Sequence, residues 1–251
     1  MNDIGEFTLL VALATAIYGC VAYVMAARGN RVDLYLSADK TPLVVWGCVM
    51  ISSICLWRAF LVNDFSLQYV WAYSNIELDT FYKIASFWGG QKGSLLFWTL
   101  LLSTYTVVVH FQNRKKNLRV VPYAMAVLLV IIIFFLFLIN FSTNPFERIP
   151  LPPEDGRGLN PLLQNYWMVI HPPTLYLGYV GFTVPFAFAV AALISKNLDD
   201  GWIRVTRKWT LISWFFLCMG NLFGASWAYV ELGWGGYWAW DPVENAAFMP
   251  L

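Results

Sequence analysis

Residues 120–140 read VVPYAMAVLLVIIIFFLFLIN, and this stretch decides the fold class. It contains no charged residue. A helix rises about 1.5 Å per residue, so a run of roughly 20 apolar residues crosses the roughly 30 Å of hydrocarbon in a bilayer. The stretch is therefore predicted to be a membrane-spanning helix.

The rest of the chain has the same character. Of its 251 residues, 59% are hydrophobic and only 12% are charged, against roughly 25% charged residues in a soluble domain. The apolar residues form runs separated by polar or Pro- and Gly-containing segments. The predicted fold class is an all-α polytopic membrane protein, with residues 1–251 forming a single helical membrane domain. Six transmembrane helices are expected at residues 6–26, 42–62, 94–111, 120–140, 173–194 and 210–227, and a seventh starts near Pro242.

Lys and Arg are distributed unevenly over the connections between these spans. Three alternate connections, residues 28–40, 113–119 and 196–209, hold eleven of them, and the remaining connections hold four. Cytoplasmic loops carry the excess of Lys and Arg, so the N-terminus is predicted to lie outside. The net charge of +1, with basic residues in short loops and not in one patch, argues neither for nor against nucleic acid. For a membrane-embedded chain the expected partner is lipid, and no nucleic acid.

Three unusual segments fall on the predicted outer side. They read WGGQKGSLLFW (88–98), IHPPTLYLG (170–178) and WGGYWAWDPVEN (234–245). In the first, the glycines could pack closely against a ligand or simply against another helix. Lys92 in that segment supplies a cation that could meet a carboxylate of a ligand.

The third segment concentrates flat aromatic rings among glycines, which remove side chains that would block close approach. Such a surface suits a flat aromatic ligand. An aromatic belt at the membrane interface is the alternative, but a belt does not require clustered glycines. The candidate cofactor-binding residues are Trp227, shortly before this segment, and, within it, Trp234, Gly235, Gly236, Tyr237, Trp238, Trp240 and Asp241.

The same segment leads into a helix start. Asp241, Pro242 and Glu244 have the spacing of an N-cap, a first helical residue and a capping-box partner. The two carboxylates are therefore expected to cap the helix, and no residue of the chain is assigned a catalytic role.

His171 is one of only two histidines in the chain. Because Pro172 follows it, we expect its ring to be fixed at the start of the fifth span. A neutral imidazole there could ligate a haem iron, and a hydrogen-bonded interfacial histidine is the alternative. The tryptophans on the same side favour the metal-ligand interpretation. His110 ends the third span about 25 Å away, so it is expected to be structural.

The third segment resembles the tryptophan-rich WWD signature shared by haem-handling proteins of the CcmF, CcmC and CcsA types. HPPTLYLGYVGF (171–182) and WGGQKGSLLFW narrow the resemblance to the CcmF type and its close relative NrfE. The resemblance runs from the second span to residue 250. The sequence thus resembles the N-terminal portion of a CcmF-type cytochrome c haem lyase. The family continues Phe-Met-Pro-Trp-Leu where this chain reads Phe248 to Leu251 as FMPL, so a fragment or a split gene product is expected.

This resemblance implies a haem-binding component of the haem lyase machinery in the bacterial inner membrane. It would receive haem from a CcmE-like haem chaperone on the periplasmic side and present it to apocytochrome c for thioether attachment, alongside other cytochrome c maturation proteins. The WWD segment, residues 227–247, would hold the haem b being delivered, with His171 as its axial ligand. In the family, a second external histidine and the ligands of a second, structural b-type haem lie beyond the position where this sequence stops.

Two other functions remain as alternatives. A transporter or ion-pump subunit would also be polytopic, but such proteins usually carry broken helices or ionisable residues near the membrane midplane, and the predicted spans place almost none there. A haem carrier of the CcmC type would move haem without attaching it, and the HPP and glycine-rich segments argue against it.

Overall fold

The computed structural model describes residues 1–251 apart from 30, 115–118 and 234. It contains six helical stretches that are long and apolar enough to cross a membrane, which confirms the predicted fold class. Helix α1 covers Asn2–Gly29, and the second stretch joins α2 (Val32–Ala38) to α3 (Thr41–Leu61). The third and fourth are α6 (Gln91–Asn113) and α7 (Val121–Phe141).

The fifth stretch joins α8 (Tyr166–Gly181) to α9 (Thr183–Ser195), and the sixth is α10 (Gly201–Glu231). The predicted seventh helix begins as α11 (Pro242–Phe248). The connection between α3 and α6 also contains α4 (Gln68–Tyr73) and α5 (Thr80–Ala85), two short helices that the hydropathy pattern did not predict.

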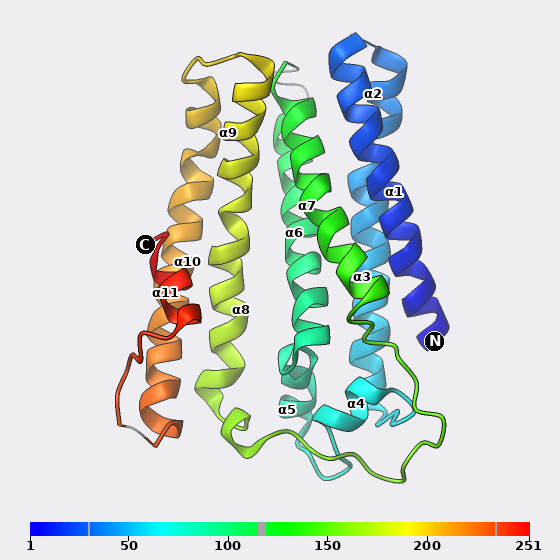
Figure 1. Ribbon diagram of the computed structural model, residues 1–251, viewed down its shortest axis with the longest axis vertical. Coiled ribbons are helices and arrows are strands. Elements are labelled where there is room, and N and C mark those ends of the chain that lie inside the picture. Colours follow the sequence, from blue (N-terminus) through cyan, green and yellow to red (C-terminus); the bar gives the residue numbers. More distant parts are fainter. Residues whose placement is uncertain (30, 115–118, 234) are drawn as a thin grey trace.

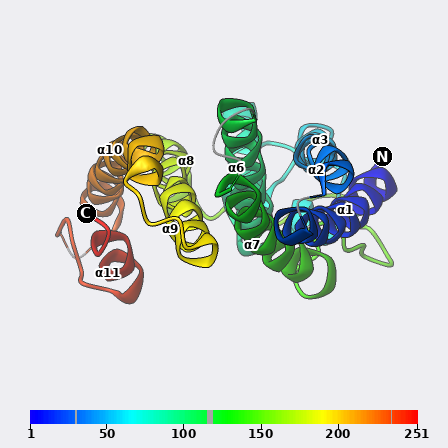
Figure 2. The same cartoon turned by 90° about the horizontal axis from the view of Figure 1, so that it is seen from above.

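The helices form an elongated row when viewed along their axes (Figure 2). Helices α6 and α7 lie in the middle, with α1 to α3 on one side and α8 to α10 on the other. The most extensive contacts join α8 to α10 and α1 to both α3 and α7, and α7 contacts α9 across the middle. Because successive spans alternate in direction, the starts of α6 and α8 lie at the same end of the bundle as the end of α10 (Figure 1).

Helices α8 and α10 begin well before the starts that the sequence predicted. Helix α8 begins at Tyr166, seven residues before the expected start, because the Asn165 side chain caps it by accepting a hydrogen bond from the Trp167 N–H at 2.8 Å. Helix α10 begins at Gly201 instead of near residue 210, and its first turns carry the basic residues Arg204, Arg207 and Lys208. Helical hydrogen bonding therefore continues past the apolar run that hydropathy detects.

Pro172 and Pro173 consequently lie inside α8 and not in its first turn. Each proline lacks an N–H, so the carbonyls four residues earlier receive no helical hydrogen bond from them. The prediction that His171 is fixed at the start of a helix was wrong in this respect, because a full turn of α8 precedes it.

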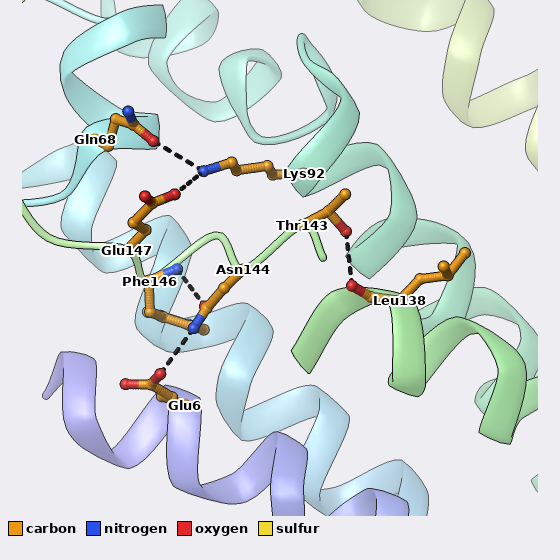
Figure 3. A network of polar contacts seen from close by, with 8 residues as sticks. All are labelled: Glu6, Gln68, Lys92, Leu138, Thr143, Asn144, Phe146 and Glu147. Carbon is orange, nitrogen blue, oxygen red and sulfur yellow. Dashed lines mark hydrogen bonds and ion pairs between the residues drawn. The ribbon is translucent and has the colours of Figure 1, made fainter. Parts of the chain in front are cut away.

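The long connection after α7 is tied down at the end of the bundle that holds the start of α6 (Figure 3). The Asn144 side chain donates to Glu6 Oε1 at 2.7 Å, which anchors the connection on α1. The Lys92 ammonium donates to Glu147 and, at 2.9 Å, to Gln68 Oε1. Lys92 therefore contributes to the folding of this connection.

Candidate functional site

Glycines let α8 and α10 approach each other closely. A Cβ built on Gly178 would lie 2.3 Å from the backbone nitrogen of Leu217, and one on Gly220 would lie 2.6 Å from the Cα of Leu175. Neither position has room for any side chain, since real Cβ atoms do not approach within 3 Å of other heavy atoms. The two helices are therefore packed backbone against backbone, as in other small-residue helix contacts in membranes.

His171 lies in this contact and is oriented by α10. Its Nδ1 is 2.8 Å from the carbonyl oxygen of Gly220, and a carbonyl can only accept, so Nδ1 carries the proton. Gly224 lies under the ring: a Cβ there would come within 2.6 Å of the His171 Cε1. The arrangement leaves Nε2 with its lone pair, and no described residue forms a hydrogen bond with it. A hydrogen bond of this kind from the second ring nitrogen is typical of histidines that ligate metals.

A cavity of about 290 Å³ opens beside His171 between α8, α10 and α11. It is near the lower limit of about 300 Å³ for small-molecule sites, so it can enclose one edge of a large flat ligand. Four of the predicted site residues line it: His171, Trp227, Trp238 and Asp241. The other lining residues are Leu175, Asn221, Gly224, Ala225, Ala228, Leu232, Ala239, Val243, Glu244 and Ala247.

The segment after α10 turns back along that helix, which brings α11 against the middle of α10 (Figure 1). Trp227, still on α10, is held by a hydrogen bond of 3.0 Å from its indole N–H to the Leu162 carbonyl. Trp238 lines the cavity, and its buried indole N–H has no hydrogen-bond partner among the described residues. That N–H is a donor available to a ligand.

The other predicted residues of the segment lie outside the cavity. Trp240 is 66% exposed and packs edge-on against Trp238 and Phe248. Tyr237 stacks on Tyr229 with ring centroids 4.7 Å apart, on the exposed surface.

The glycines of this segment are exposed or half-buried. Gly235 has a φ of +69°, which favours glycine, and a Cβ there would meet no atom within 4 Å. Gly236 is half-buried next to it, and Trp234 lies outside the described residues. The open space around Gly235 is compatible with the close approach of a flat ligand.

Asp241 caps α11 as predicted. Its Oδ1 accepts hydrogen bonds of 2.7 Å from the N–H groups of Val243 and Glu244, and Pro242 occupies the first helical position. The Glu244 carboxylate reaches back to the N–H of Ala239 at 2.7 Å and not to that of Asp241. The cap therefore ties the tryptophan-rich segment to the helix that closes the cavity.

Replacing Asp241 with Ala should loosen α11. The variant loses both hydrogen bonds to the first turn, at a cost of about 1 kcal/mol, which is large for a helix of seven residues. We expect faster amide hydrogen exchange across Pro242–Phe248, measured by mass spectrometry. Glu77→Ala removes an exposed carboxylate that caps no helix and serves as the control. Unchanged exchange in Asp241→Ala would contradict this role of the cap.

The first segment, WGGQKGSLLFW (88–98), packs against neighbouring helices. A Cβ on Gly93 would lie 1.8 Å from the Phe87 carbonyl oxygen, so this glycine allows the turn before α6 to close. Trp98 packs against Tyr176 of α8, with ring centroids 5.3 Å apart. The segment supports α8 and does not line the cavity.

His110 is buried at the other end of the bundle, as expected for a structural residue. Its Nδ1 lies 3.4 Å from Oδ1 of Asp39, and the other carboxylate oxygen, Oδ2, accepts a hydrogen bond of 3.0 Å from Arg114. The two histidines of the chain are thus held by different partners on different helices.

Gly220 and Gly224 are site residues that the sequence analysis missed. They are spaced four apart on α10 in GNLFG (220–224), the small-xxx-small pattern of close helix contacts. The pattern was available in the sequence, but nothing in it indicates that His171 is the residue that packs there.

Comparisons with known proteins agree with this architecture. The family model described as "Cytochrome C assembly protein" matches residues 88–251. The chain is 43% identical over 251 residues to the cytochrome c-type biogenesis protein CcmF of Escherichia coli (strain K12), which covers 100% of this chain and 39% of that relative. It is 42% identical over 250 residues to the cytochrome c-type biogenesis protein NrfE of Haemophilus influenzae, and this match covers 100% of this chain and 39% of that relative.

A solved structure of the cytochrome c haem lyase CcmF is also similar. It superposes with a TM-score of 0.85 at 33% sequence identity, over 98% of this chain and 39% of that one. The chain therefore spans about two fifths of the length of the relatives that it matches.

Proposed function

This chain belongs to the cytochrome c assembly protein family, and from that premise we propose that its cavity holds haem on the outer face of the membrane for attachment to apocytochrome c. The observation that carries the proposal is His171. Its Nδ1 is engaged by Gly220, which leaves Nε2 as a neutral ligand beside a cavity lined by tryptophans. A neutral imidazole nitrogen is a common axial ligand of haem iron.

The remaining lining residues suit haem. Trp227 and Trp238 offer apolar ring surface to a porphyrin, and the unpartnered Trp238 N–H can donate to a propionate or another acceptor. The cavity encloses one edge of a flat ligand, while the open space around Gly235 leaves its approach free. His171, Trp227, Trp238 and Gly235 are the residues we assign to haem binding.

Residues of this chain would orient the haem more than react with it. Bound haem supplies the vinyl groups, which form thioethers with the two cysteine thiols of a C-x-x-C-H sequence. His171 would fix the height and tilt of the ring, because its own orientation is set by α10. Such positioning of two reactants is itself a major contribution to rate. Asp241 and Glu244 are occupied as caps, so we assign them no proton transfer.

The proposed haem site needs groups from outside this chain. The chain offers one imidazole near the cavity, since His110 is held by Asp39 elsewhere, so a second axial ligand would come from another segment or protein. A CcmE-like haem chaperone would deliver haem b, and apocytochrome c would receive it. The excess of basic residues on the loops at the opposite end supports a periplasmic position for the cavity in a bacterial inner membrane.

Haem titration of the purified chain in detergent tests this function. We expect a Soret band typical of a single histidine ligand, which His171→Ala removes and added imidazole restores. His110→Gln serves as the matched control, because it changes the other histidine and should leave the band unchanged. A tight bis-histidine spectrum, or a band that survives His171→Ala, would contradict the assignment.

A further inference from the structure

A second and larger cavity lies at the end of the bundle opposite His171. It has a volume of about 520 Å³ and is formed by the end of α1, the start of α2, the start of α7 and the end of α9. The side chains that characterise it are Arg31, Tyr35, Arg119, Tyr123, Ile194 and Lys196. None of them takes part in the haem site proposed above.

The cavity is strongly cationic. Arg31, Arg119 and Lys196 line it, and none of its described lining residues carries a carboxylate. Arg31 pairs with Asp33 at 2.8 Å, whereas Arg119 and Lys196 form no ion pair within the described part of the chain. Helix α7 begins directly after Arg119 and Val120, so the positive end of its dipole faces the same region. These charges together favour an anion with several oxygens.

The phenol groups add hydrogen-bonding capacity. Tyr35 and Tyr123 both line the cavity. A phenol hydroxyl can donate a hydrogen bond to a phosphate oxygen, so the two tyrosines add donors to the lining. The cavity is therefore equipped to bind a phosphate oxyanion.

The rim of the cavity is apolar and exposed. Val32 and Ile194 line it and are 69% and 53% exposed. Seven residues after Tyr123, on the same face of α7 and about 10 Å deeper in the membrane, Val130 is 53% exposed. A ligand that binds both the cationic lining and the apolar rim must have an anionic head and an apolar body.

We propose that this cavity binds the headgroup of an anionic phospholipid. The phosphate of the lipid would lie between Arg119 and Lys196. The acyl chains of the lipid would lie along the exposed face of α7 that contains Val130. Basic pockets between transmembrane helices at one membrane surface are the kind of site that binds such lipids. The bound lipid would join the α1–α3 side of the row to α9, which meet at this cavity.

Lipid titration of the purified full chain, followed by native mass spectrometry, tests the proposal. Dioleoyl-phosphatidylglycerol should bind more tightly than dioleoyl-phosphatidylcholine. Neutralising the two unpaired cations in the double variant R119Q/K196Q should weaken phosphatidylglycerol binding roughly tenfold or more. Inorganic phosphate at millimolar concentration should not compete, since it lacks the apolar body.

A matched control separates the site from general surface charge. R207Q/K208Q removes two exposed basic residues from the start of α10, at the same end of the molecule but outside the cavity. It should change the affinity less than twofold. Ala27→Phe fills the cavity without changing its charge and should reproduce the loss. Equal losses in both double variants, full competition by phosphate, or no loss in Ala27→Phe would each overturn the proposal.

Discussion

Replacing Gly224 with Ala is expected to abolish haem ligation by His171 while the chain remains folded. The added Cβ would lie 2.6 Å from Cε1 and 2.8 Å from Nδ1 of the ring. The ring is the movable partner in this clash, so it should shift and break the 2.8 Å hydrogen bond to Gly220. Loss of such a bond to a ligating histidine alone costs about 10- to 100-fold in affinity. Displacement of Nε2 should increase the loss.

The measurement is the haem affinity from the Soret titration, together with thermal unfolding. Gly233→Ala is the matched control, because a Cβ there meets nothing within 4 Å and the residue lies in the same tryptophan-rich region. It should bind haem as the unchanged chain does. Normal haem affinity in Gly224→Ala would show that the ring position described here does not determine binding.

Gly178→Ala is expected to destabilise the fold itself. Here the added Cβ would lie 2.3 Å from the Leu217 backbone nitrogen, and a backbone atom cannot move without its helix. Helices α8 and α10 would have to separate along their most extensive contact. Overpacking of this kind costs about 1–3 kcal/mol and occasionally more. Both the unfolding temperature and haem binding should therefore fall.

The control for this second variant is Gly47→Ala, in the interior of α3. A Cβ there meets nothing within 4 Å, and alanine favours helix over glycine by up to about 1 kcal/mol. Gly47→Ala should leave the unfolding temperature unchanged or raise it. If Gly178→Ala behaved in the same way, the close packing of α8 on α10 would not hold in solution.

The spans could be predicted from sequence because a helix that crosses a bilayer needs a run of roughly 20 apolar residues, which hydropathy detects directly. Their ends could not, because helix termini depend on local hydrogen bonds. The Asn165 cap starts α8 a full turn before His171, and α10 continues through charged residues that hydropathy excludes. Hydropathy locates the residues that lie in the hydrocarbon of the bilayer, but it does not locate the helical turns that extend beyond it.

The candidate site was predictable in its chemistry but not in its geometry. Ring type and spacing indicated an aromatic platform, and the structure places Trp227 and Trp238 with His171 at one cavity. Trp240 is instead 66% exposed, and its backbone has a φ of +58° in the segment that turns back along α10. No periodicity could reveal that reversal, which depends on contacts between α11 and α10.

The orientation of His171 depends on two helices, which limits how this ligand can be moved into another protein. The ring is held in place by Gly220 and Gly224 of α10, while Pro172 and Pro173 remove backbone hydrogen bonds from α8 next to it. A graft of α8 alone into a different bundle would carry the imidazole but not its orientation. The smallest exchangeable unit of this ligand is the helix pair.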